Sequence, residues 1–213
     1  MDILEIKEPI VKDERIIEYE MHQYEPITGS NLNNPGEIRI NIETQDLYTH
    51  PSESYLLLEG ELLKNDGTRY GDNDEITITN NGLMHCFSNI KYQLSGQEIE
   101  SVFHPGQATT MLGILKYPDH ELNSCWMLDL GKGFDNSNKA AIERRNYIIK
   151  QSDPKGGFAF IIPLKHIFGF AEDYNKVVYG FKHTLTLVRT GDKDAIFRAA
   201  NVLAGKIQFS KIS

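Results

Sequence analysis

The sequence predicts a mainly β protein built as an antiparallel sandwich, with one or two short helices in its loops. Two observations support this prediction. Apolar and polar residues alternate with a period of two in several short runs, as in strands that bury one face. Residues that favour turns separate these runs at the spacing of an all-β sandwich. At 213 residues, the chain is long enough to bury roughly 70% of its unfolded surface without disulfides or metals.

The first half of the chain predicts at least five strands before residue 105. Ile38 and Ile40 alternate with polar residues, and the same pattern returns in the later runs. Asp66-Gly67 and Asn81-Gly82 follow two of the runs, and such pairs predict hairpin turns because they favour positive φ. The expected strands lie near residues 38–42, 54–63, 76–78, 90–94 and 99–102.

One segment of helical periodicity interrupts the strands. Apolar residues recur at helical spacing over residues 107–116, and Pro118 ends the pattern. A second short helix is expected over Ser137–Arg145, and a strand in the run CWMLDL at residues 125–130. The side chains of the first helix that would pack against the sandwich are Met111, Leu112 and Leu115.

The last part of the chain predicts a hairpin and two further strands. Tyr147–Lys150 and Phe158–Leu164 flank a loop with one Pro and two Gly, which favours a hairpin. Thirteen residues, 177–189, alternate without interruption and indicate one long strand. Gly205–Ile212 forms the final expected strand, with Ile207 and Phe209 on one face.

The long expected strand has two different faces. Lys182, Thr184 and Thr186 lie on the polar face. If the other face points into the core, replacing Phe181 with Ala costs roughly 3–5 kcal/mol, and replacing Thr184 costs far less. The apolar face that we expect to point inward consists of Val177, Tyr179, Phe181, Leu185 and Leu187.

Composition excludes several classes of protein. A net charge of −8 without a basic tail argues against direct, sequence-specific binding of nucleic acid, which depends on clustered Lys and Arg. The N-terminus lacks the apolar core of a signal peptide, and no run approaches a membrane span. Two cysteines, Cys86 and Cys125, are too few for a disulfide framework and are expected to be buried thiols. These features predict an intracellular origin, in the nucleus or cytoplasm, and no membrane partner.

No pattern of residues indicates catalysis, metal binding or a cofactor. The histidines are scattered without the pairs of a cupin or a metalloprotease, and His183 is expected to be a hydrogen-bonded core imidazole. His85-Cys86 has no second pair nearby, and the loop at 65–75 misses the spacing of a calcium loop. Glu172-Asp173 fits a solvated turn better than an acid and base dyad. The seven histidines are His22, His50, His85, His104, His120, His166 and His183.

Two long strings carry a resemblance to a known family. Residues 87–118, FSNIKYQLSGQEIESVFHPGQATTMLGILKYP, form the first string, and residues 158–198, FAFIIPLKHIFGFAEDYNKVVYGFKHTLTLVRTGDKDAIFR, form the second. They closely resemble the double jelly roll-like, major capsid-type proteins of Polinton and adintovirus-like integrated DNA viruses. The resemblance spans about residues 35–212, and it matches the N-terminal half of that family.

The resemblance implies a fold and a role. The fold would be a jelly-roll β-sandwich, the first roll of a double jelly roll, with residues 1–34 as an N-terminal arm and residues 35–213 as the domain. The role would be a structural capsid protomer, without catalysis, that associates with itself and with other capsid proteins in a virion. A chain with both rolls would form trimeric, pseudo-hexagonal capsomers. Contacts are expected on the Lys182, Thr184 and Thr186 face or at the corner Ile99 to Pro105.

The length is shorter than a double roll requires, which leaves three origins open: a truncated product, a decayed endogenous viral copy, or a domesticated single roll. If a second roll is missing, apolar groups near the last strand are expected to be exposed and to favour weak self-association. The candidate groups are Ile207, Phe209 and Ile212.

Two other functions stay open. A host genome could retain the sandwich as a binding module for glycans or proteins, with loop tyrosines that stack on sugars. An enzyme is the third and weakest possibility. The loop tyrosines are Tyr48, Tyr55, Tyr70 and Tyr117.

Overall fold

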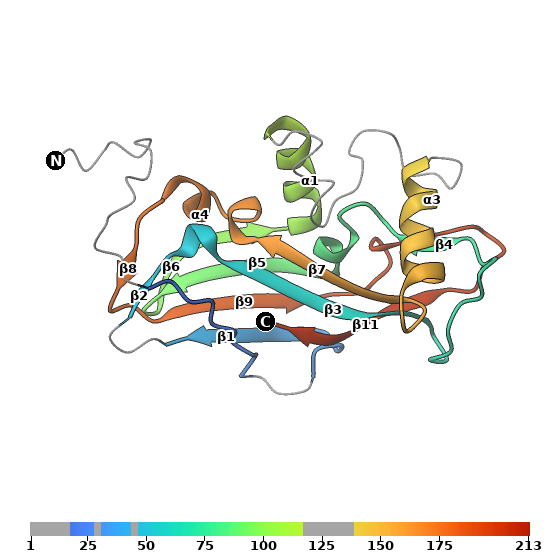
Figure 1. Cartoon of the computed structure of the whole chain (residues 1–213), viewed down its shortest axis with the longest axis horizontal. Coiled ribbons are helices and arrows are strands. Elements are labelled where there is room, and N and C mark those ends of the chain that lie inside the picture. Colours follow the sequence, from blue (N-terminus) through green and yellow to red (C-terminus); the bar gives the residue numbers. More distant parts are fainter. Residues whose placement is uncertain (1–17, 28–30, 44–46, 117–138) are drawn as a thin grey trace.

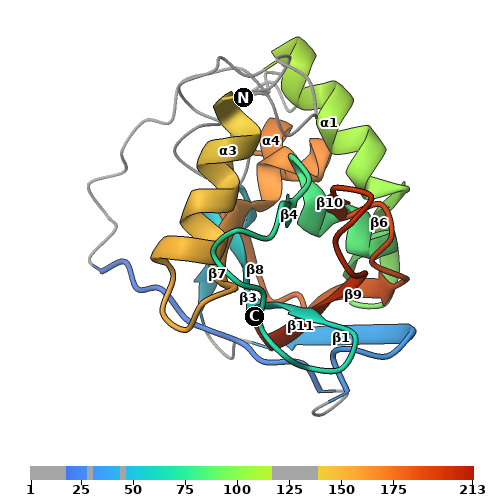
Figure 2. The same ribbon diagram turned by 90° about the vertical axis from the view of Figure 1, so that its right-hand side faces the viewer.

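A computed structural model describes residues 18–27, 31–43, 47–116 and 139–213. Two antiparallel sheets face each other across one core, and α1, α3 and α4 lie on the same side of them (Figure 1, Figure 2). The described helices are α1 (Pro105–Lys116), α3 (Lys139–Arg145) and α4 (Gly169–Asp173). The expected strand at residues 125–130 lies outside the described residues.

Four of the strands form the larger sheet, in the order β1-β9-β5-β6. Its strands are β1 (Gly36–Ile42), β9 (His183–Arg189), β5 (Phe87–Leu94) and β6 (Gln97–Phe103). Ser95 and Gly96, with φ of 47° and 85°, form the tight turn between β5 and β6. Ile38 and Leu187 are paired neighbours, and both are almost fully buried.

The facing sheet has the order β11-β3-β7. Its strands are β11 (Gly205–Ile212), β3 (Tyr55–Lys64) and β7 (Gly157–Pro163). Leu56, Leu58 and Leu62 of β3 alternate inward, as the period of two predicts. A register shift between Phe209 and Lys211 lets β11 bury both Phe209 and Ile212.

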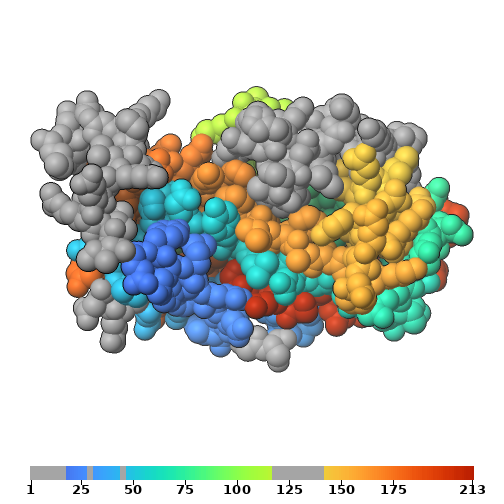
Figure 3. Space-filling model, in the orientation of Figure 1, coloured from blue at the N-terminus to red at the C-terminus, as the bar shows by residue number. Residues whose placement is uncertain are grey.

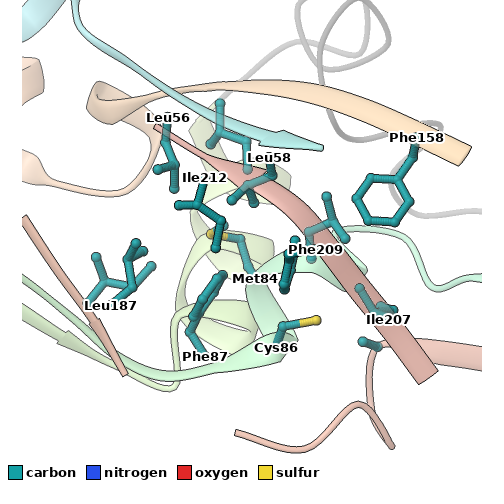
Figure 4. Packing of buried hydrophobic residues seen from close by; sticks show 14 of the residues in the cluster. Leu56, Leu58, Met84, Cys86, Phe87, Phe158, Leu187, Ile207, Phe209 and Ile212 are labelled. Atoms are coloured by element: carbon teal, nitrogen blue, oxygen red, sulfur yellow. The ribbon is translucent and has the colours of Figure 1, made fainter. Parts of the chain in front are cut away.

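The core joins both sheets through large apolar side chains. Phe87 of β5 and Phe209 of β11 stack with ring centroids 5.9 Å apart, and Phe158 of β7 meets Phe209 edge to face at 6.2 Å (Figure 4). Met84 and Cys86 enter the same core from the short helix η2 (Gly82–Cys86). The sandwich is therefore closed by contacts between residues as far apart in the sequence as Phe87 and Phe209.

Smaller elements extend the two sheets. The short strands are β4 (Ile76–Ile78), which pairs with β10 (Ile196–Arg198), and β2 (Tyr48–Thr49), which pairs with β8 (Val178–Tyr179). We call the β2 and β8 pair the ribbon. The remaining short helices are η1 (Pro51–Glu53), the π-helical turn η3 (Asn146–Gln151) and η4 (Leu164–His166).

The predicted fold class is confirmed, because the chain is mainly antiparallel β with a few short helices. The final strand is confirmed with Ile207 and Phe209 facing the core. However, Ile207, Phe209 and Ile212 are each at most 3% exposed, so the expectation that they form an exposed patch is wrong. These side chains fill the space between the sheets.

Several local predictions are wrong. The segment 177–189 is two strands, because Gly180 adopts φ of 76° between β8 and β9. Tyr147–Lys150 continues α3 as the π-helical turn, where the Ser152 N–H bonds the Tyr147 carbonyl, so no hairpin forms there. The turns at Asp66-Gly67 and Asn81-Gly82 do form, with positive φ at Gly67 and Asn81, but the strands beside them pair with distant strands.

The inward face predicted for 177–189 is only half right. Leu185 and Leu187 are buried in the core, whereas Val177, Tyr179 and Phe181 are about half exposed. The apolar face changes from exposed to buried after Gly180, because the ribbon lies beyond the end of the facing sheet. The expected 3–5 kcal/mol cost of Phe181→Ala therefore does not follow from the structure.

Candidate functional surfaces

The structure describes six of the seven histidines. Within the described ranges, no group of three or more His, Cys, Asp or Glu side chains is arranged to hold a metal ion. His120 lies outside these ranges. Burial lowers the pKa of both His85 and His183, but the two rings belong to different elements. The prediction that the chain has no catalytic, cofactor or metal residues stays a prediction.

His183 is a hydrogen-bonded core imidazole, as its position in the sequence predicted. It is 3% exposed at the start of β9. Its Nδ1 lies 2.5 Å from the Tyr92 hydroxyl, and its Nε2 lies 2.8 Å from Oγ1 of Thr49. The Thr49 hydroxyl also donates to the Val178 carbonyl at 3.1 Å. The imidazole thus connects β5 to the ribbon.

His85 and Cys86 belong to the junction between η2 and α1. The Cys86 thiol is fully buried, and its burial raises its pKa to about 12. The ring of His85 lies directly on Gly106, where a β-carbon would come within 2.5 Å of the ring. Asn81 donates its side-chain amide to the Gly106 carbonyl at 2.9 Å and to Thr109 at 2.8 Å. His85 and Asn81 therefore dock α1 onto η2, whereas Cys86 belongs to the core.

The helix α1 confirms the predicted helix, but its packing is the reverse of the prediction. Its inward side is made of small residues, Gly106, Thr109 and Gly113, which allow close approach to η2. Its apolar side chains point outward, and Leu115 is 84% exposed. We call this surface the α1 patch, and its members are Met111 (61% exposed), Leu112 (41%), Ile114 (60%) and Leu115.

The predicted contact corner, Ile99 to Pro105, lies along the edge strand β6. Ile99 is 39% exposed, and Phe103 is 67% exposed. β6 pairs only with β5, and among the described residues no backbone group from elsewhere bonds its outer edge. An open edge with exposed apolar side chains is a template for strand pairing.

The predicted polar contact face, by contrast, is largely covered. Thr184 and Thr186 are 8% and 4% exposed, although they point away from the core. Each sits on the central strand β9, with Thr186 between Arg39 and Lys91 in the register of the sheet. Only Lys182 of this predicted set is exposed.

The ribbon carries a second exposed apolar surface. Tyr48 and Tyr179 pair across its two strands with ring centroids 4.8 Å apart, and they are 69% and 51% exposed. We call this surface the ribbon patch. Its further members are Leu47, Val177 and Phe181, which are about half exposed.

Not all of the loop tyrosines are available to a ligand. Tyr55 is 45% exposed, whereas Tyr70 is 3% exposed and donates its hydroxyl to the Leu203 carbonyl at 3.0 Å. Tyr117 lies outside the described residues. The acidic loop at 65–75 caps its own backbone, since Asp66 accepts the Thr68 N–H at 2.8 Å. Its carboxylates are thus partly used by the turn itself.

Two other edge strands, β11 and β1, carry polar contacts. On β11, the Ile207 N–H donates to Asp192 at 2.9 Å, and Asn33 bonds both the N–H and the carbonyl of Phe209 at 2.6 and 2.9 Å. On β1, the Ile27 N–H donates to the Arg39 carbonyl at 2.9 Å. Sequence reasoning missed these caps, because they join residues as far apart as Asn33 and Phe209. Figure 3 shows residues 18–27 lying against the outside of the body.

Other acidic groups serve local structure. The carboxylate of Glu100 accepts the N–H groups of Gly169 and Phe170 at 3.0 and 2.8 Å and so caps α4. Glu172 pairs with Lys116 at the end of α1. None of the described helices is long and apolar enough to span a membrane.

The described residues thus form an antiparallel sandwich with one open edge at β6 and two exposed apolar patches. These features define a β-sandwich protein whose candidate sites are contact surfaces. Residues 76–213 match the model of the double jelly roll-like domain. The chain therefore belongs to the double jelly roll-like domain family. Its sandwich is the jelly-roll fold that the sequence predicted.

Comparison with known structures gives a fold similarity. The chain is similar to the structure described as "PBCV-1 virus capsid, quasi-atomic model", with a TM-score of 0.46 and 12% identity. The match covers 86% of this chain and 38% of that chain, so the protein spans well under half of its length. No curated protein matches the sequence.

Proposed function

We propose that the protein is a structural, capsid-type protomer that works by self-association and not by catalysis. The observation that carries this proposal is membership in the double jelly roll-like domain family over residues 76–213. The α1 patch supports it, because a cluster of four large apolar side chains on one helix favours association. The open edge of β6 offers a second contact on the same protomer.

The finer assignment rests on the strings at 87–118 and 158–198. We propose that the protein comes from a Polinton or adintovirus-like element, as a virion component or an endogenous copy, and that it resembles the N-terminal roll. A form with both rolls would assemble as trimers through head-to-tail contacts that close after three protomers. Its partners would be other capsid proteins, and its acidic charge disfavours direct binding to nucleic acid.

The test is the state of association of the full chain over the range from about 1 to 200 µM. Light scattering coupled to size exclusion should show a mass that rises with concentration. Met111→Glu with Leu115→Glu places two charges in the α1 patch and should keep the chain monomeric. Gln107→Glu, on an exposed position of the same helix, is the matched control and should associate like the wild type. A wild-type chain that stays monomeric throughout would contradict the proposal.

One observation favours the alternative of a binding module for glycans. Tyr48 and Tyr179 offer exposed rings at one end of the molecule, and sugars stack on such rings. If the protein is a glycan-binding module, Tyr48→Ala should abolish binding on a glycan array while self-association is unchanged. Association that depends on the α1 patch, without any glycan signal, would favour the capsid-type role.

A further inference from the structure

The ribbon is joined to the large sheet by a directed chain of hydrogen bonds. Thr49 has one hydroxyl proton and gives it to the Val178 carbonyl. Its Oγ1 therefore accepts a proton from Nε2 of His183, which leaves Nδ1 to accept the Tyr92 hydroxyl. The chain Tyr92 to His183 to Thr49 to Val178 is complete only when the imidazole is neutral.

A second ring proton would break this chain at its centre. On Nδ1 it would turn the Tyr92 hydroxyl, 2.5 Å away, from a donor into an acceptor. Among the described residues, this buried hydroxyl has no other hydrogen-bond partner, so its own proton would lose its acceptor. The second ring proton would also place a positive charge on a side chain that is 3% exposed. Burial lowers the pKa of His183 from its ordinary value, in line with this geometry.

Two carboxylates on the segments next to His183 have other partners. Glu100 caps α4, and Glu43 pairs with Lys182. Among the described residues, no carboxylate hydrogen-bonds the imidazole and so none compensates its charge. The titratable groups on the surrounding elements are Glu37 and Arg39 of β1, Tyr92 and Lys91 of β5, Glu98 and Glu100 of β6, Glu172 and Asp173 of α4, Tyr48 of β2, Tyr179 of β8, His166 of η4, His50, Glu43 and Lys182.

The contacts around Gly180 define which residues would move if the ribbon detached from the sheet. Gly180, with φ of 76°, separates β8 from β9. Two residues later, the Lys182 carbonyl accepts the Ser95 N–H at 2.7 Å and fixes the chain to the turn between β5 and β6. The ribbon can therefore detach up to Gly180 while β9 keeps its place in the sheet.

We propose that His183 is an acid-sensitive latch: the neutral imidazole holds the ribbon on the sheet, and protonation releases β2 and β8 together with the ribbon patch. This inference is independent of the proposed function. A released imidazole has an ordinary pKa of about 6.5. The latched state therefore loses stability as the pH falls below about 6.5, and this loss reaches its full size once the pH lies below the lowered pKa of the latched ring.

Hydrogen exchange measured by mass spectrometry on the full chain tests the latch at pH 7.5, 6.5, 5.5 and 4.5, after correction for intrinsic exchange rates. Peptides covering residues 47–50 and 176–180 should exchange at least tenfold faster at pH 4.5 than at pH 7.5. Peptides covering residues 184–188 should keep their protection. Acceleration of all three together, or of none, would overturn the latch.

Two variants separate the latch from a general acid effect. His183→Gln keeps an N–H that can donate to Thr49 but cannot titrate, so ribbon exchange should become independent of pH. His22→Gln, at an exposed histidine, should behave like the wild type. If His183→Gln follows the wild-type pH response, or if His22→Gln also abolishes it, the latch is wrong.

A measurement on the wild type covers the case in which His183→Gln does not fold. The imidazole of His183 should titrate by NMR below pH 6.5, and the Val178 amide should shift with the same midpoint. Tyr92→Phe removes the donor to Nδ1, so it should move both midpoints to higher pH. A Val178 amide that does not respond at the His183 midpoint would overturn the proposal.

Discussion

Leu187 and Phe181 lie on one apolar stripe of the sequence, yet the structure gives them opposite surroundings. Leu187 is fully buried between the sheets, whereas Phe181 is 49% exposed beyond Gly180. A buried leucine loses its contacts and leaves a cavity when it is truncated, whereas a half-exposed ring loses less. Whether an apolar side chain of this stripe is buried therefore depends on whether the facing sheet covers its part of the strand.

Leu187→Ala should cost about 2–5 kcal/mol of unfolding free energy, because its site lies in the middle of the core. Phe181→Ala should cost less than about 1 kcal/mol. Urea unfolding of both variants at the same pH compares them directly. A larger loss for Phe181→Ala would mean that the ribbon patch is covered in solution.

The thiol of Cys86 should be unreactive in the folded chain, since burial raises its pKa to about 12 and the thiolate is the reactive form. In a Cys125→Ser background, alkylation by iodoacetamide at pH 8 should be at least 100-fold slower than in denaturant. Rapid labelling of the native chain would indicate local opening around η2.

Asp192 should be needed for the core around β11. Its carboxylate pairs with the Arg189 guanidinium, which is buried over the Phe209 ring at 5.1 Å, and it accepts the Ile207 N–H. Asp192→Ala leaves a buried cation unpaired and should cost about 3–5 kcal/mol. Asp194→Ala, at an exposed neighbour, should change the unfolding free energy by less than about 0.5 kcal/mol. Equal effects would mean that the pair is solvated.

At the scale of elements, strands were predicted well where apolar residues alternate with polar ones and all face the core. The run 54–63 became β3, and Gly205–Ile212 became β11. The pairing of strands could not be predicted, because β3 lies between β11 and β7, which are both distant in sequence. Positive-φ turns were identified correctly, but a turn fixes only its own backbone and not the sheet that its strands enter.

The exposed surfaces, like the strands, could be predicted from the sequence only in part. At the corner Ile99 to Pro105, which the sequence suggested as a contact surface, Ile99 and Phe103 are exposed, whereas Pro105 is buried. The α1 patch was missed, since periodicity locates an apolar stripe without saying which stripe the core covers. The signal that could have shown it is the spacing of Gly106, Thr109 and Gly113, small residues that permit close helix packing.

Gly106→Ala should weaken the docking of α1, although Ala favours helices more than Gly does. The added β-carbon would lie 2.5 Å from the ring of His85, so one of the two elements must move. We expect a lower thermal midpoint for Gly106→Ala. The double variant with His85→Ala should recover part of this loss, and purely additive effects would contradict the contact.

At the scale of the whole molecule, residues before the sandwich take part in its closure. Leu32 is 8% exposed in the core cluster, and Asn33 caps Phe209 of β11. The boundary at 34 and 35 stays a prediction. These contacts nevertheless make residues 31–34 part of the protection of the β11 edge.

Deleting residues 1–34 should therefore lower thermal stability and increase aggregation more than deleting residues 1–17, because only the longer deletion removes Leu32 and Asn33. The longer deletion frees two backbone groups of Phe209 and uncovers apolar surface. Thermal unfolding and light scattering at matched concentration compare the two. Identical behaviour would mean that the caps contribute nothing.

The two edges of the large sheet differ, and this difference limits how many copies of the chain can join through it. β1 is bridged by Pro26 and Ile27, whereas β6 is open among the described residues. Two copies that join through β6 would form one continuous eight-stranded sheet whose outer strands are both β1. Such a sheet ends in bridged strands at both sides, so polymerisation through this sheet terminates at the dimer and does not propagate into a fibre.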